Sequence, residues 1–86
     1  MAPEELVGVV TDYYKKIGVA AIRLDAGALS VGDTIRVRGH TTDLTQPVES
    51  LQLEHQAVQR AERGSHVAVK MLDRVRKHDP VFRVTG

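Results

Sequence analysis

Residues 27–39, Gly-Ala-Leu-Ser-Val-Gly-Asp-Thr-Ile-Arg-Val-Arg-Gly, decide how this chain folds. Gly32 can adopt a positive φ without Cβ strain, and the Asp33 side chain can accept hydrogen bonds from nearby backbone, so the pair predicts a tight turn. After the turn the residues alternate, with Ile35 and Val37 on one face and polar side chains on the other. The stretch is therefore predicted to be a turn that leads into a half-buried strand.

Strands are predicted on both sides of this stretch. Before it, two apolar segments rich in β-branched residues are separated by a turn at residues 15–18, which predicts a hairpin. After it, residues 40–46 predict a polar loop, because their side chains favour local bonds to the backbone, and a bulge is expected near Ser50. The predicted strands are residues 6–14, 19–24, 34–38, 48–53, 66–71 and 80–84.

Residues 54–63 allow two interpretations. Leu51, His55, Val58 and Ala61 fall on one stripe of a helix, so a single helical turn is possible. A long helix is not favoured, because Gly64 directly restarts a strand pattern. The side chains predicted to point into the core are Ile35, Val37, Val67, Val69 and Phe82.

Six short strands without a long helix are typical of an antiparallel barrel or sandwich. Closure into a small barrel removes exposed edge strands, so the sequence predicts an all-β, closed six-stranded antiparallel barrel. We expect one domain over residues 1–86, in which residues 1–5 form a loose leader.

Composition limits the function. The chain has 86 residues, 42% apolar, with a net charge of +1 and no cysteine. No apolar run approaches the ~20 residues that span a bilayer, and the N-terminus lacks the basic start of a signal peptide. We therefore expect a cytoplasmic protein that does not interact with membranes.

No arrangement of residues predicts catalysis or a cofactor. The four histidines, at positions 40, 55, 66 and 78, are too widely spaced to predict a metal site. No nucleophile-elbow spacing surrounds the serines. A phosphate-binding Gly-x-x-x-x-Gly-Lys-Ser/Thr loop is missing, so no nucleotide is expected. The sequence predicts a protein that is not an enzyme.

Basic residues form the candidate site. Arg36 and Arg38 share the outer face of one predicted strand, about 6.6 Å apart, which is close to the spacing of successive phosphates. Arg74, Arg76 and Lys77 lie in the last connection, where positive charge is in excess. These five residues are candidates for contact with an RNA backbone, although ordinary solvent-facing charge is the alternative. Tyr13 and Tyr14 beside Lys15 and Lys16 offer little stacking surface, because aromatic residues make up only 3% of the chain.

The order of these motifs resembles the second domain of translational GTPases such as elongation factor Tu. The resemblance rests on the Gly-Asp turn with its alternating strand and on four short patterns that cover the chain from about Leu6 to Val84. These patterns are Gly8-x-Val10, Val48-x-Ser50, Ala61-x-x-Gly64-x-x-Val67 and Val75-x-x-x-Asp79-x-Val81.

The resemblance implies a Greek-key barrel that contacts RNA, the ribosome or another translation partner without being an enzyme. The GTPase domain of that family is missing here. A similar barrel also resembles an accessory domain of U32-type peptidases. The alternative function is therefore a protein-interaction module that docks on a separate enzyme or GTPase.

Overall fold

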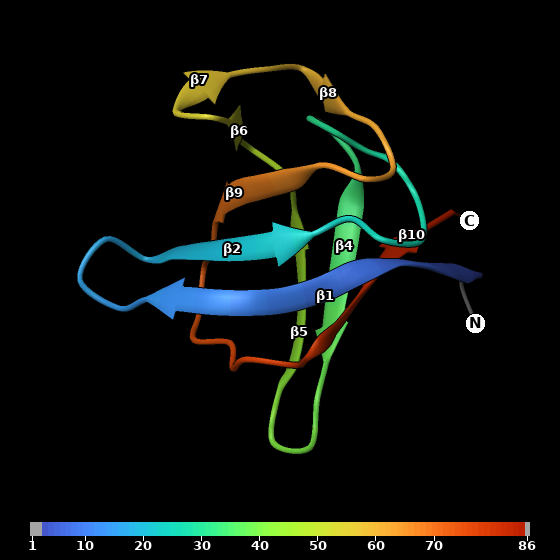
Figure 1. The fold of residues 1–86 in the computed structure, drawn as a ribbon. Helices are drawn as coiled ribbons and strands as arrows, with labels where there is room; N and C mark the ends of the chain where they lie inside the picture. The colour runs from blue at the N-terminus through green and yellow to red at the C-terminus, as the bar shows by residue number, and fades with distance from the viewer. Residues whose placement is uncertain (1–2, 86) are drawn as a thin grey trace.

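The computed structural model describes residues 3–85, and all of its regular structure is antiparallel β-sheet (Figure 1). Eight strands form one sheet in the order β5-β4-β10-β1-β2-β9-β6-β7, and β3 pairs separately with β8. The predicted all-β fold is confirmed. The strands are β1 (Glu4–Tyr14), β2 (Val19–Arg23), β3 (Leu29–Ser30), β4 (Thr34–Arg38), β5 (Asp43–Pro47), β6 (Leu51–Leu53), β7 (Gln56–Ala57), β8 (Arg60–Ala61), β9 (His66–Lys70) and β10 (Pro80–Val84).

The long strand β1 joins the two halves of the sheet. Its first half pairs with β10 and its second half pairs with β2, and the register shifts between Leu6 and Gly8 and again between Val10 and Asp12. Such irregularities bend a strand and increase its twist. The sheet therefore folds over itself, and β4 and β5 cross the direction of β1, β2 and β9 (Figure 1).

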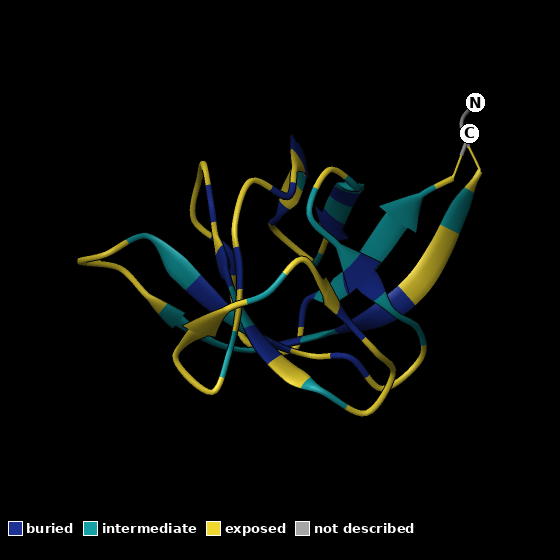
Figure 2. Cartoon of the chain, turned by 90° about the horizontal axis from the view of Figure 1, so that it is seen from above, coloured by how far each residue is buried: buried dark blue, intermediate teal, exposed yellow. Residues whose placement is uncertain are grey.

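The hydrophobic core lies between these two halves. Buried positions alternate along the strands, as in β2, β4 and β9, and exposed residues gather at the turns (Figure 2). Ile35, Val37, Val67 and Val69 are buried as predicted. The buried apolar side chains are Val7, Val10, Ala20, Ile22, Leu24, Leu29, Ile35, Val37, Val48, Leu51, Ala61, Val67, Val69, Met71, Val75 and Val81.

Two predicted turns are confirmed. Gly32 has a φ of 97°, and Asp33 closes the turn because its Oδ2 accepts a hydrogen bond of 2.8 Å from the amide of Ser30. Gly18 has a φ of 65° at the end of the turn between β1 and β2. Both turns contain a glycine with positive φ, and the first also has the local side-chain bond of Asp33, which is why the local sequence predicts them.

The helical turn considered for residues 54–63 does not form, because no helix occurs among residues 3–85. Glu54 and His55 instead have φ values of 51° and 66° and make a two-residue loop between Leu53 and Gln56, which pair with each other. Two positive φ values are the mark of the turn that matches the twist of a β-hairpin.

The polar loop predicted at residues 40–46 is found only at residues 40–42 and is wrong beyond them, because β5 begins at Asp43 and pairs with β4 along its whole length. Gln46, 3% exposed, supplies the reason. Its Nε2 donates to the carbonyl of Lys70 (2.8 Å) and its Oε1 accepts from the amide of Leu72 (2.8 Å). A buried polar side chain is tolerated when it is hydrogen-bonded, so a polar segment can form this strand.

The sheet is not closed into a barrel. β5 and β7 are its two ends among the described residues, and no backbone ladder joins them. The Gln46 side chain links β5 to the end of β9 where a closing ladder would lie. The predicted closed six-stranded barrel therefore differs from the open, curled eight-stranded sheet that is observed.

The strand predicted at residues 48–53 is shorter than expected. Residues 48–50 lie outside any strand, and β6 starts at Leu51. Val48 pairs instead with the central turn, since its amide donates to the carbonyl of Asp33 and its carbonyl accepts from Gly32. This turn takes up the backbone groups of Val48, so the bulge expected near Ser50 is replaced by a break.

The loose leader is wrong for its described part. Glu4 and Glu5 belong to β1, and the carbonyl of Pro3 accepts a hydrogen bond of 2.8 Å from the amide of Thr85. Residues 1 and 2 lie outside the described residues. The paired strands β1 and β10 therefore hold both ends of the described chain together.

The inward position predicted for Phe82 is also wrong. In β10 it is Val81 that is fully buried, because Val81 pairs with the inward-facing Val37 of β4. Phe82 lies beside Arg36 on the outer face, where the guanidinium of Arg38 lies 4.6 Å from the centre of its ring. This cation–π contact covers the aromatic ring from outside the core.

Candidate functional site

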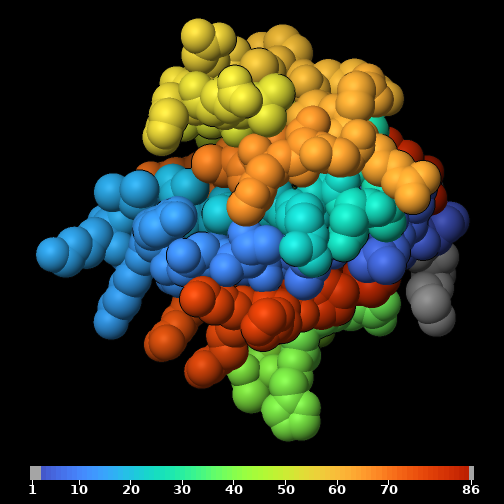
Figure 3. Space-filling model, in the orientation of Figure 1, coloured from blue at the N-terminus to red at the C-terminus, as the bar shows by residue number. Residues whose placement is uncertain are grey.

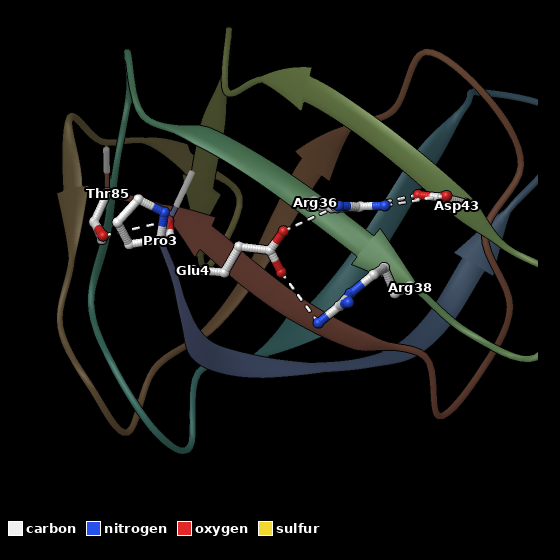
Figure 4. A network of polar contacts seen from close by, with 6 residues as sticks. All are labelled: Pro3, Glu4, Arg36, Arg38, Asp43 and Thr85. Carbon is white, nitrogen blue, oxygen red and sulfur yellow. Dashed lines mark hydrogen bonds and ion pairs between the residues drawn. The ribbon is translucent and has the colours of Figure 1, made fainter. Parts of the chain in front are cut away.

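The two predicted basic residues of β4 are bound within the protein. A carboxylate of β1 lies between them: Glu4 accepts a hydrogen bond from the Arg36 guanidinium at 3.1 Å and forms an ion pair with the Arg38 guanidinium, also at 3.1 Å (Figure 4). Arg36 also contacts Asp43 of β5 at 3.1 Å. β1 contributes Glu4, β4 contributes both arginines and β5 contributes Asp43, so this network ties three strands together. Both arginines therefore carry compensated charge.

The network shifts the pKa values of Asp43 and Arg36. The Arg36 guanidinium donates a side-chain hydrogen bond that holds the pKa of Asp43 below its ordinary value of 3.8. The same contact, with a smaller contribution from Glu4, raises the pKa of Arg36. A carboxylate with a lowered pKa in the folded state stabilises the fold above its unfolded pKa. That stabilisation is lost as the pH falls through the lower, folded pKa.

We expect Arg36→Gln to raise the pKa of Asp43 back toward 3.8, because the charged hydrogen-bond donor is lost. The measurement is an NMR titration of the side-chain carboxyl carbon. Arg60→Gln is the matched control, since Arg60 lowers the pKa of Glu62 and makes no ion pair with Asp43. An unchanged titration of Asp43 in Arg36→Gln would show that the ion pair does not form in solution.

The other three predicted residues lie together at a different place. Arg74, Arg76 and Lys77 belong to the connection between β9 and β10, and together with Lys15 they line a hollow of about 320 Å³. Arg74 and Arg76 also line a neighbouring hollow of about 270 Å³ beside β5, which contains Asp43. The connection therefore forms a ridge of basic residues between two hollows.

The connection that carries these residues is fixed at three points. At its start, the amide of Leu72 donates to Gln46, as described above. In its middle, Val75 is 2% exposed and packs in the core. At its end, Asp79, 6% exposed, accepts from the amide of Arg76 at 3.0 Å. The basic side chains thus project from a backbone that is already held in place.

The structure separates the candidate residues into two groups. It brings Arg36 together with Arg38, and it brings Arg74 and Arg76 together with Lys77. Whether these five residues bind RNA is not tested by the structure, and their role stays a prediction. The sequence did not identify two further participants. Glu4 falls in the segment predicted to be a leader, and Lys15 falls beside the tyrosines of the first predicted strand. The adjacent lysines at the hairpin turn are the signal in the sequence that points to Lys15.

No cluster of three or more His, Asp or Glu side chains within residues 3–85 is placed to hold a metal ion. In this part of the chain there is also no helix long and apolar enough to cross a membrane. Of the four histidines, His66 contacts Thr11 at 2.7 Å between its ring Nε2 and the hydroxyl.

Two proteases contain a segment similar to this chain. The collagenase of Porphyromonas gingivalis is 33% identical over 78 residues, which cover 90% of this chain and 22% of the collagenase. An uncharacterized protease of Methanocaldococcus jannaschii is 40% identical over 77 residues, which cover 88% of this chain and 19% of that protease. The chain therefore spans about a fifth of the length of the curated relatives it matches. No protein-family model matches the chain.

The fold has a close counterpart among solved structures. The C-terminal domain of a Geobacillus thermoleovorans putative U32 peptidase superposes with a TM-score of 0.86, covering 94% of this chain and 93% of that domain. Sequence identity to it is 19%, so this likeness concerns the fold alone.

These comparisons correct the resemblance drawn from the sequence. The similar proteins are proteases and a peptidase domain, so the assignment to the second domain of translational GTPases is wrong. The prediction that the chain acts in translation, as an elongation-factor-like protein that binds RNA or the ribosome, is wrong for the same reason. The alternative, an accessory domain like that of a U32 peptidase, is better supported.

Proposed function

We propose that this chain is a non-catalytic accessory domain that contacts the catalytic part of a U32-type peptidase. One observation carries this proposal. The matches cover about nine-tenths of this chain but only about a fifth of each protease, and the same fold stands as a separate C-terminal domain in a putative U32 peptidase. Peptide hydrolysis then belongs to the other four-fifths of such proteases. Residues 1–86 act as one unit in this proposal.

The chemistry of the described residues supports an accessory role. A carboxylate can act as a general acid or base only if it is free to exchange protons with a substrate. Glu4 and Asp43 are neutralised by the arginines of β4, and Asp79 is buried against the amide of Arg76. Asp33 closes the central turn. These carboxylates are therefore used to hold the fold.

The proposal predicts the behaviour of three collagenase forms. The rate of gelatin cleavage is measured for three forms of the Porphyromonas gingivalis enzyme. The 78 matched residues are intact in the first, deleted in the second and replaced by this chain in the third. We expect deletion to slow cleavage by roughly tenfold or more, corresponding to ~1.4 kcal/mol of lost transition-state stabilisation, and replacement to restore most of the rate. This chain alone should not cleave gelatin.

Two results would contradict the proposal. Cleavage by this chain alone would make it an enzyme. An unchanged rate after deletion would show that the segment does not assist the catalytic part.

A further inference from the structure

The positive charges of this chain are unevenly compensated. Of its 12 Lys and Arg residues, five make ion pairs with carboxylates, namely Arg23, Arg36, Arg38, Arg60 and Arg83. Arg63 and Lys70 donate to backbone carbonyls. The others make no side-chain hydrogen bond or ion pair within residues 3–85, and they are Lys15, Lys16, Arg74, Arg76 and Lys77.

These five uncompensated residues lie at one end of the molecule, which we call the cationic end. The turn that carries Lys15 is held against the start of the β9–β10 connection, since the amide of Met71 donates to the carbonyl of Gly18 at 2.8 Å. Lys70 Nζ donates to the carbonyl of Ile17 at 3.1 Å. Figure 3 shows the blue hairpin and the orange-red connection projecting on the same side.

Fewer negative than positive charges lie at the cationic end. Asp12, Asp73 and Asp79 are the carboxylates within it, and each accepts from a backbone amide, that of Tyr13 at 2.9 Å, of Arg74 at 2.7 Å and of Arg76 at 3.0 Å. Asp43, in the neighbouring hollow, is paired with Arg36. Five positive and three negative charges leave +2 at this end. Because the whole chain carries +1, the remainder of the molecule carries −1. The protein is therefore electrostatically polarised toward this end.

Two large apolar side chains are exposed at the same place. Ile17 is 61% exposed and Leu72 is 65% exposed, against 46% for Leu6 and 49% for Tyr14. Gly18 and Met71 are joined by a backbone hydrogen bond; Ile17 directly precedes Gly18 and Leu72 directly follows Met71. A group of exposed apolar side chains surrounded by polar residues indicates an interaction surface, whereas an isolated exposed apolar side chain does not.

We propose that the cationic end docks on an acidic surface of the peptidase catalytic part, with Ile17 and Leu72 at the centre of the contact. This inference rests on the proposed function. An apolar centre with a charged rim is the usual anatomy of a protein interface, and interfaces between domains of one protein are modest in area and rather polar. The backbone of the β9–β10 connection is already fixed before docking, which limits the conformational entropy lost when its arginines bind.

The test compares the isolated 86-residue chain with the collagenase in which this chain replaces the matched segment. Hydrogen exchange is measured for the backbone amides of residues 15–17 and 73–77. We expect these amides to exchange more slowly in the full-length replacement protein than in the isolated chain, and the difference to shrink in high salt, which screens the charges.

Variants assign the protection to this surface. Leu72→Ser and Arg76→Glu, made separately, should abolish the slower exchange and reduce gelatin cleavage severalfold. Leu6→Ser and Arg63→Glu are the matched controls, because they make the same changes at other exposed positions. The melting temperatures of all four isolated variants should stay close to wild type, since these exposed side chains lie outside the buried core.

The outcomes separate the two proposals. If the replacement protein cleaves gelatin but its amides exchange as in the isolated chain, docking through this end is wrong and the accessory function stands. Equal effects of site and control variants would have the same meaning. If the replacement protein does not regain cleavage, the accessory function and the docking surface both fail. Slower exchange caused only by added transfer RNA would also overturn the docking proposal.

Discussion

The Gly8→Ala variant is expected to lose most of its folding stability. A Cβ atom at Gly8 would lie 2.2 Å from the carbonyl oxygen of Arg23 and 3.2 Å from the Cα of Leu24. Both are backbone atoms, one in the last residue of β2 and one in the residue after it, so no side chain can rotate away to make room. The register of β1 against β10 shifts between Leu6 and Gly8. The close approach of β1 to the end of β2 depends on the side chain that Gly8 lacks.

The expected loss is on the order of 3–5 kcal/mol, among the largest effects of single substitutions. A domain of this length has a total stability of about 4–13 kcal/mol, so the variant should melt far below wild type or not fold cooperatively. Thermal unfolding followed by circular dichroism measures this. In the matched control Gly27→Ala the new Cβ lies 3.0 Å from Cγ1 of the Val7 side chain. A smaller loss of about 1 kcal/mol is expected there. If both variants melted alike, the strand crossing at Gly8 would not be as tight as described.

Local patterns in the sequence predicted the strands that alternate clearly. In β4 and β9 the large apolar side chains share one face, so the pattern places Ile35, Val37, Val67 and Val69 in the core. In β10 the pattern gives two nearly equal choices, because Val81 and Phe82 are both apolar. Pairing with β4 places Val81 in the core, and the Arg38 guanidinium over the Phe82 ring holds Phe82 outside it. Both are contacts between distant parts of the chain.

The polar strand β5 shows a second limit of local patterns. Its sequence, residues 43–47, contains one large apolar side chain, and propensity alone predicts a loop. The partners of Gln46 lie at Lys70 and Leu72, more than twenty positions away. A buried side chain with distant hydrogen-bond partners leaves no signal in its own neighbourhood.

Only part of the candidate site could be predicted, again because contacts between distant residues leave no local signal. The positive excess in the last connection is visible from composition. Its meeting with Lys15 depends on the long-range bond between Gly18 and Met71. Pairing of Glu4 with Arg36 and Arg38 joins residues more than thirty positions apart. Charge counts therefore located the basic residues but did not show which of them are compensated.

The resemblance to translation factors was wrong because its motifs serve folding. The Gly32–Asp33 turn closes through Ser30, and the alternation after it fills the core. Such features recur wherever a similar sheet must turn and pack, so they indicate fold without indicating function. Function has to be inferred from groups that the fold does not use, and here these are the uncompensated cations and the two exposed apolar side chains.

Val69→Asp is expected to unfold the protein at neutral pH. Val69 has no exposed surface and lies in β9 between two strands, paired with Ala20 of β2 and with Leu51 of β6. All three side chains are buried and apolar, so a carboxylate there would lose its hydration without gaining a partner. The expected loss of about 4 kcal/mol or more is comparable with the whole stability of a domain of this length.

The pH dependence of this variant distinguishes buried charge from a packing defect. A carboxylate in the core has its pKa raised above the unfolded value, so folding is least unfavourable where the group is protonated and becomes worse as the pH rises. We therefore expect Val69→Asp to show more native circular dichroism at pH 4 than at pH 7. In the adjacent control Ala68→Asp the side chain lies on the opposite, partly exposed face of β9, and a melting temperature near that of wild type is expected. A Val69→Asp protein that melts like wild type at pH 7 would show that β9 does not present this face to the core.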